Sequence, residues 1–331
     1  MSGFLSPKGV AENAVEISKN KSELQILPML QHSPGTGKPE DREPQMIDNY
    51  GREVDSLRLS VTGRCNLDCP YCHREGGLND SGREISLAEI EEITRTAREL
   101  GFKKIKITGG EPLLRNEIIE IIKIIKKNNF EDISLVTNGL LLERYAKQLS
   151  EAGLDRVNIG CDSLNSNFLS KNKEVIEPGL KAAKASNLYP IKLNMVVLRG
   201  INDSEIDSMI EFARQNDVIL QLIELINANN DYYTKYHFDL EPVEKNLEGK
   251  AARIIKRKDN NRRQYDLEGV FVEVVRPFHE SFCKNCRRLR ITSDGRLKPC
   301  LMLNDNLLEF KGKSSFLEAI NQRVVFNDRH N

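Results

Sequence analysis

Six segments of strand length alternate with segments of helical periodicity between residues 57 and 226. The first strand is LRLSVT (57–62), and the helix that follows it is SLAEIEEITRTARELG (86–101), which ends at a glycine. The sixth strand is ILQLIELI (219–226). Strands joined by helices of this length pair in parallel, because the chain must cross over before it can start the next strand. The alternation therefore predicts an α/β fold with a parallel sheet.

Polar side chains line one face of three of these strands. A doubly wound sheet is apolar on both faces, so this pattern favours an incomplete (β/α)6 TIM-type barrel with a polar, ligand-holding interior. In such a barrel the site lies at the carboxyl ends of the strands. The polar face comprises Arg58, Ser60 and Thr62 of the first strand, Lys104, Lys106 and Thr108 of the second, and Lys192 and Asn194 of the fifth.

The composition changes on either side of the alternating region. Residues 1–46 are rich in Pro, Gly, Lys, Glu and Ser without a strand or helix period, so we expect a mostly disordered extension. Its GTGK stretch lacks the glycine and the hydroxyl residue that a phosphate loop needs, and we interpret it as a linker. Residues 47–226 would form the partial barrel, and residues 227–331 would form a C-terminal region that carries a second metal site and binds substrate.

Charge and hydropathy exclude several classes of protein. Lys+Arg and Asp+Glu both number 49, so we expect no bulk binding of nucleic acid. No apolar run approaches the ~20 residues that a membrane span needs. The first residues carry acidic side chains and no apolar signal region, which predicts a cytoplasmic protein. Seven cysteines in a reducing compartment are expected to be ligands or catalysts rather than disulfides.

Three cysteines follow the first predicted strand, with the spacing C-x3-C-x2-C at Cys65, Cys69 and Cys72. Three thiolates leave a structural zinc site one ligand short. They can instead hold a [4Fe-4S] cluster in which one iron keeps an open position. Spacing alone also permits zinc or buried thiols.

A second group has the spacing C-x2-C-x13-C at Cys283, Cys286 and Cys300. It again offers three thiolates rather than four. The alternative for this group is a zinc knuckle whose fourth ligand is His279 or Cys161. We expect Cys161, on the fourth strand, to be an ordinary buried thiol.

The second group encloses a predicted hairpin. Asp294-Gly295 between alternating segments is a strong signal for a two-residue turn, which would place Ile291 opposite Lys298. Arg288 and Arg290 lie two residues apart, so they share one face of the strand and could bind the same anion.

The first cysteine group, an aromatic residue before its last cysteine, and the GGEP of residues 109–112 after the next strand together resemble the radical S-adenosylmethionine (SAM) superfamily. The resemblance implies that Cys65, Cys69 and Cys72 hold a [4Fe-4S] cluster that binds SAM. SAM would then be cleaved to a 5′-deoxyadenosyl radical that takes hydrogen from a substrate. Glycines would let the GGEP backbone approach SAM closely. The implied SAM contacts are Tyr71, Lys106, Gly109, Gly110, Glu111, Thr137, Asn138, Asp162 and Ser163.

Several longer segments narrow the resemblance. LRLSVTGRCN, KITGGEPLLR and CKNCRRLRITSDGRLKPCL are similar to the GTP 3′,8-cyclases of molybdenum cofactor biosynthesis, and CHREGG resembles their archaeal members. The similarity implies a second [4Fe-4S] cluster on Cys283, Cys286 and Cys300 that binds guanine, and attack of a C3′ radical on C8 of GTP. The implied GTP contacts are Arg58, Lys104, Lys192, Arg288 and Arg290, each a cation on the polar face of its strand.

The same similarity implies partners. These are the small molecules SAM and GTP, an electron donor protein and, at a later step of the pathway, a cyclic pyranopterin monophosphate synthase accessory protein. A homodimer is also compatible with the similarity.

Three departures from the family pattern limit this interpretation. Gln221 stands where the family often has arginine, Gly160 stands where it often has serine, and the sequence ends in Asp328–Asn331 rather than a Gly-Gly tail. One alternative is a paralogous radical SAM enzyme with an auxiliary cluster that acts on another small molecule or a peptide. A second alternative is a non-catalytic zinc-binding protein.

Overall fold

The structure is a computed structural model. It describes residues 14–20, 23–26, 45–75, 82–165, 171–257, 260 and 262–325. Within these residues, no helix has both the length and the apolar character that crossing a membrane would need.

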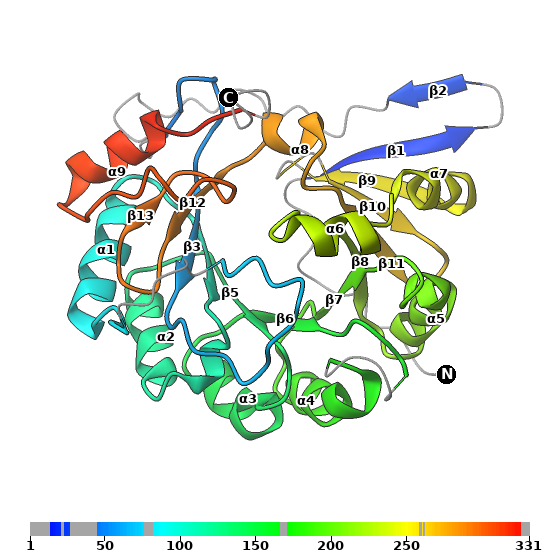
Figure 1. Cartoon of the computed structure of the whole chain (residues 1–331), viewed down its shortest axis with the longest axis horizontal. Coiled ribbons are helices and arrows are strands. Elements are labelled where there is room, and N and C mark those ends of the chain that lie inside the picture. The colour runs from blue at the N-terminus through cyan, green and yellow to red at the C-terminus, as the bar shows by residue number, and fades with distance from the viewer. Residues whose placement is uncertain are drawn as a thin grey trace, which may run out of the picture.

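Six parallel strands form the centre of the sheet, and the helices that follow them lie outside it, so that the sheet curves around a central space (Figure 1). This arrangement confirms the predicted incomplete barrel. The strands are β3 (Ser56–Ser60), β4 (Lys104–Thr108), β5 (Asp132–Thr137), β6 (Arg156–Gly160), β7 (Lys192–Val197) and β8 (Ile219–Glu224). The helices are α1 (Leu87–Glu99), α2 (Ile118–Lys127), α3 (Leu142–Glu151), α4 (Lys173–Ala185) and α5 (Ile206–Gln215), with 3-10 turns η2 (Pro112–Leu114) and η3 (Asp203–Glu205).

The C-terminal region extends this sheet at both edges. Strand β12 pairs in parallel with β3, and β11 pairs in parallel with β8. Antiparallel strands then continue the sheet outward on each side. The elements are α6 (Asn230–Tyr236), α7 (Glu241–Lys250), β9 (Arg253–Arg257), β10 (Arg263–Asp266), β11 (Phe271–Val275), α8 (Glu280–Lys284), β12 (Arg288–Ile291), β13 (Leu297–Lys298) and α9 (Lys313–Asn321).

Two short strands lie within the N-terminal extension, and they are compatible with the expectation of a mostly disordered segment. Strand β1 (Ala14–Asn20) pairs antiparallel with β9 and with β2 (Glu23–Ile26). The sequence AVEISKN alternates apolar and polar residues, which suits a strand added to an open sheet edge. The other residues of 1–44 lie outside the described residues, and the expectation for them stays a prediction.

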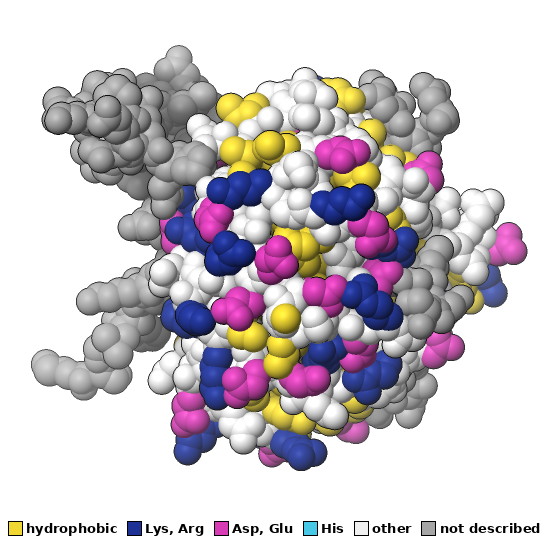
Figure 2. All heavy atoms as spheres, turned by 90° about the vertical axis from the view of Figure 1, so that its left-hand side faces the viewer, with side chains coloured by type: hydrophobic (Ala, Val, Ile, Leu, Met, Phe, Trp, Pro, Cys, Tyr) yellow, Lys and Arg dark blue, Asp and Glu magenta, His cyan; other side chains and the backbone are white. Residues whose placement is uncertain are grey.

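The two faces of the barrel sheet differ in polarity. On the outer face, Leu57 and Leu59 are fully buried against the helices, together with Ile90 and Ile93 of α1. Ser86 is the N-cap of helix α1, and its capping box with Glu89 satisfies free backbone donors of the first turn. On the outer surface shown in Figure 2, Lys and Arg side chains are interspersed with Asp and Glu. The inner face instead gathers charges of one sign, as described below.

The β12–β13 hairpin has a different register from the predicted one. Arg290 lies opposite Lys298, and Ile291 lies opposite Leu297. The loop contains three residues rather than two, because Gly295 adopts a left-handed conformation (φ 92°) after a turn that begins at Thr292. A shift of one residue moves a side chain to the other face of a strand. Lys298 therefore lies on the same face as Arg290.

Candidate functional site

The first cysteine group lies on the loop after β3, at the carboxyl end of the barrel strands. Cys65, Cys69 and Cys72 are free thiols, and the amide of Cys72 donates to the carbonyl of Cys69 in a tight turn. All three line a cavity of about 1150 Å³. The donor set therefore fits a cluster that three thiolates bind from one side.

The GGEP loop after β4 packs directly on the cysteine loop. The amide of Gly110 donates to the Thr62 carbonyl at 2.8 Å, and the amide of Glu111 donates to the Arg64 carbonyl at 2.7 Å. A Cβ atom on Gly110 would lie 2.2 Å from the Arg64 oxygen. Glycine is therefore needed here because two backbones meet, which is a different contact from the approach to a ligand that the sequence suggested.

Glu111 joins the ends of β4 and β5. Its carboxylate is buried and accepts hydrogen bonds from the Thr137 hydroxyl and the Asn138 amide, both at 2.7 Å. Burial raises the pKa of this carboxyl group. The side chain of Asn138 donates to Asn66 on the cysteine loop at 2.8 Å. These residues thus form the frame that holds the cysteine loop.

Asp162, at the end of β6, anchors the cysteine loop from the other side. Its carboxylate is fully buried and accepts hydrogen bonds from the Tyr71 hydroxyl and from Lys171, the latter at 2.8 Å. The Lys171 ammonium lies 4.9 Å from the centre of the Tyr71 ring. Ser163 instead directs its hydroxyl to Glu205 at 2.9 Å. Sequence reasoning missed Lys171, which belongs to no motif.

A line of cations crosses the inner face of the barrel. The pairing registers place Lys298, Arg290, Arg58 and Lys106 opposite one another on β13, β12, β3 and β4. Lys104 lies two residues before Lys106 on β4. It pairs with Ser56 of β3, which in turn pairs with Arg288 of β12. The structure therefore brings together four of the five cations assigned to GTP by resemblance, and it adds Lys106, which the resemblance assigned to SAM.

Lys106 has mostly cations as its charged neighbours. Burial lowers its pKa well below the ordinary value, and the charges of Arg156 and Arg58 lower it further. Within the part of the chain that the structure describes, no carboxylate lies within ion-pair distance of this ammonium. A half-buried ammonium in such surroundings favours an anionic ligand.

Two carboxylates offset part of the positive charge. Glu75, three residues after Cys72, binds Arg58, and it also lies 3.4 Å from Arg290. Arg58 and Arg290 hold the pKa of Glu75 well below its usual range despite burial.

Glu273 of β11 is the second carboxylate, and it offsets positive charge on the opposite side of the barrel. It binds Lys192 at 2.6 Å, Gln221 at 2.7 Å and Arg262 at 3.4 Å. Burial lowers the pKa of Lys192 to about 7, although Glu273 opposes the shift. In this chain, the side-chain amide of Gln221 therefore donates a hydrogen bond to the Glu273 carboxylate.

Several inner-face atoms are buried without a hydrogen-bond partner within the described residues. They are Arg58 Nε, Thr108 Oγ1, Asn158 Oδ1 and Asn194 Oδ1. Buried polar atoms are nearly always paired in folded proteins. Their grouping inside the barrel supports a polar ligand there.

The second cysteine group lies at the opposite end of the barrel strands from the first. Cys286 precedes β12, whose first residue pairs with Ser56 at the start of β3, whereas Cys65 follows the end of β3. Cys283 is buried in α8, and Cys300 follows β13. Burial opposes ionisation of the Cys286 thiol, but the charge of Arg323 and two further arginines lower its pKa.

A buried network holds this second group in place. Asp48 accepts hydrogen bonds from Arg52 at 2.7 Å and from Arg323 at 2.6 Å. The two arginines then donate to the carbonyls of Cys283 and Cys286, respectively. The contacts of Arg52 with Cys283 and of Arg323 with Asp48 join segments 231 and 275 residues apart, so no sequence motif could reveal them.

The expectation for Cys161 agrees with the structure, since it is fully buried and burial raises the pKa of its thiol to about 12. Within the described residues, no three His, Cys, Asp or Glu side chains converge as a single metal ion requires. The ligands of a cluster are spaced more widely, because each thiolate binds a different iron.

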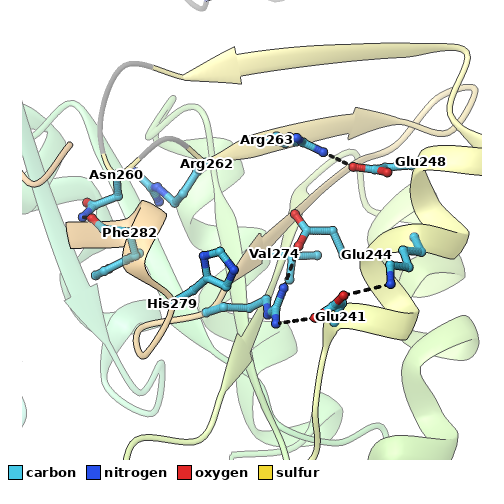
Figure 3. Close-up of a pocket in the computed structure, with 11 residues that line it drawn as sticks. Glu241, Glu244, Glu248, Asn260, Arg262, Arg263, Val274, His279 and Phe282 are labelled. Atoms are coloured by element: carbon cyan, nitrogen blue, oxygen red, sulfur yellow. Dashed lines mark hydrogen bonds and ion pairs between the residues drawn. The ribbon is translucent and has the colours of Figure 1, made fainter. Parts of the chain in front are cut away.

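His279 lies at a separate cavity of about 310 Å³. Figure 3 shows this cavity between the segment that carries His279 and Phe282 and the helix that carries Glu241 and Glu244. Charged groups on its wall pair with each other, as in the contact of Arg276 with Glu241 at 3.1 Å.

Comparisons with known proteins agree with this geometry. Residues 59–213 match the family model described as the Radical SAM superfamily, and residues 218–314 match Molybdenum Cofactor Synthesis C. A protein of Methanothermobacter thermautotrophicus named "Probable GTP 3′,8-cyclase" is 45% identical over 84% of this chain and 98% of its own length. A protein of Pyrococcus abyssi with the same name is 46% identical over 81% and 91%.

Solved structures support the fold. SuiB of Streptococcus suis bound to S-adenosylmethionine superposes with a TM-score of 0.60 at 15% identity, covering 85% of this chain and 67% of SuiB. The enzyme anSMEcpe with bound AdoMet gives 0.58 at 18% identity, covering 82% and 81%.

The Asp48 network generates a prediction. Asp48→Asn leaves two buried arginines without their carboxylate, which should lower the free energy of unfolding by about 3–5 kcal/mol. In metal-free protein, the Cys283 thiol should also react faster with a thiol reagent than in the wild type. Urea titration and labelling kinetics measure both effects. Glu120→Gln, at an exposed ion pair on α2, is the control and should change neither. An Asp48→Asn protein with wild-type stability would contradict the assigned role.

Proposed function

We propose a function from one premise: the chain belongs to the GTP 3′,8-cyclase family of the radical SAM superfamily. The proposed reaction converts GTP to 3′,8-cyclo-7,8-dihydro-GTP, the first step of molybdenum cofactor biosynthesis. Relatives at 45% and 46% identity that carry this name support it. The observation that carries the substrate assignment is the line of cations on the inner face of the barrel.

A triphosphate suits these cations because it concentrates negative charge on one small group. Arg58 and Arg290 present planar guanidinium groups from neighbouring strands, which suits two-point recognition of phosphate oxygens. Lys104, Lys106 and Arg288 extend the positive surface along the same strands. Each charge-assisted contact is worth ~1.5–3 kcal/mol. A few such contacts would hold GTP with its ribose inside the barrel.

Cys65, Cys69 and Cys72 would hold the first [4Fe-4S] cluster at one end of this interior. When bound, that cluster supplies the electron that cleaves SAM and so starts the radical reaction. The chain's own part is to keep the cysteine loop still, which the Tyr71–Asp162 and Asn66–Asn138 contacts support. The GGEP loop packs on the same cysteine loop, so SAM bound there would face the barrel interior.

Cys283, Cys286 and Cys300 would hold a second [4Fe-4S] cluster at the other end. The large cavity supports this arrangement, because its wall includes Cys65, Cys69 and Cys72 and also Leu301 and Met302, which follow Cys300. A nucleotide that spans the barrel between the two cysteine groups would start in that cavity, beside the first group. From the family resemblance we propose that guanine binds the second cluster. The same resemblance suggests an electron donor protein as a partner and an accessory protein that acts at a later step of the pathway.

Anaerobic incubation with GTP, SAM and a reductant, followed by mass analysis, tests the reaction. The wild-type protein should hold about eight iron atoms per chain and form the cyclised nucleotide. Changing Cys283, Cys286 and Cys300 to Ala should leave SAM cleavage but abolish the cyclised product, since only the first cluster remains. SAM cleavage by the wild type without a cyclised product would favour a paralogue with another substrate. Stoichiometric zinc without iron would favour the zinc-binding alternative.

Lys192 should make GTP affinity depend on pH. Its pKa lies at about 7, so the ammonium loses its charge as the pH rises above 7, and triphosphate binding weakens. The affinity should fall up to about tenfold per pH unit above 7. Lys192→Arg stays charged throughout and is the matched control. Anaerobic calorimetry between pH 6 and 9 should therefore give a steeper decline for the wild type than for the variant. Equal slopes would exclude Lys192 as the titrating contact.

A further inference from the structure

We propose that Lys298 is a further phosphate-binding residue, and that it completes with Arg58 and Arg290 a subsite at which the Glu75 carboxylate now lies. The inference rests on the proposed function, because it takes a phosphate group of GTP as the ligand. Neither the cysteine motifs nor the resemblance to the GTP 3′,8-cyclases assigned a role to Lys298.

The register of the hairpin places Lys298 in the substrate site. Lys298 lies opposite Arg290, and Arg290 lies opposite Arg58. Neighbouring strands are ~4.8 Å apart, so the three residues span roughly 10 Å across the sheet. With the predicted two-residue turn, Lys298 would have pointed to the other face. The three-residue loop is the reason that it joins the cations.

Lys298 is buried, and the neighbouring charges that act on it are that of Arg290, which opposes its own, and that of Glu75, which favours it. It is 2% exposed, and its ammonium donates to the amide oxygen of Asn304 at 2.6 Å. Among the described residues, no carboxylate lies within ion-pair distance of it. An ammonium has three donors, and burying it with one neutral acceptor is costly. Asn304 lines the large cavity, so a ligand in that cavity could supply the missing anion.

Glu75 marks where that anion would sit. Its carboxylate contacts both Arg58 and Arg290, and its side chain is 12% exposed. Carboxylate and phosphate oxygens accept hydrogen bonds from the same arginine groups. A phosphate carries more charge than a carboxylate, so it would compete successfully for these donors. Glu75 follows Cys72 closely, so its displacement would take place beside the first cysteine loop.

Anaerobic calorimetry on the cluster-loaded protein tests the proposal with two probes, GTP and inorganic tripolyphosphate. Lys298→Gln should weaken the binding of both probes at least tenfold, whereas Lys298→Arg should retain most of the affinity. Glu75→Gln removes the competing charge and should tighten both. The electron paramagnetic resonance spectrum of the second cluster is recorded in parallel and should not change in Lys298→Gln.

Other results would overturn the proposal. If Lys298→Gln binds both probes like the wild type, Lys298 contacts no phosphate. If the variant weakens GTP but not tripolyphosphate, and the spectrum of the second cluster changes, Lys298 serves that cluster instead. A failure of the proposed function would look different, because the wild-type protein itself would then not bind GTP.

Discussion

Cations on the inner face of the barrel are the constraint on which the rest of the structure depends. Parallel pairing in register sets Arg290, Arg58 and Lys106 side by side, and the buried interior strengthens their mutual repulsion. The largely apolar outer face, packed under five helices, keeps the sheet intact against this repulsion. Glu75 and Glu273 offset part of the charge, and an anionic ligand would offset the remainder.

The same sheet also sets the distance between the two cysteine groups. Strand β3 is five residues long, so the loops at its two ends are separated by roughly 16 Å of strand. The first group follows β3, and the second group flanks β12 and β13 at the other end. A nucleotide between them could approach one group with its ribose and the other with its base. The C-terminal strands thus complete the barrel site itself, because β12 pairs directly with β3.

The sequence predicted those parts of the molecule that local patterns encode. Hydrophobic periodicity predicted the six central strands and their helices, and the cysteine spacings and GGEP indicated the chemistry. The periodicity could not reveal contacts between distant segments, such as the Asp48 network that holds Cys283 and Cys286. It also could not fix the hairpin register, because Asp294-Gly295 suits a two-residue turn as well as the observed loop. That single residue of register decides which face Lys298 occupies.

The most direct measurement is a crystal structure of the anaerobic, cluster-loaded protein with GTP bound. The account predicts that the triphosphate lies inside the barrel, with its oxygen atoms within 3.5 Å of Arg58 and Arg290, and that Glu75 has left both arginines. A triphosphate that points to solvent, with Glu75 still bound to Arg58 and Arg290, would contradict the account.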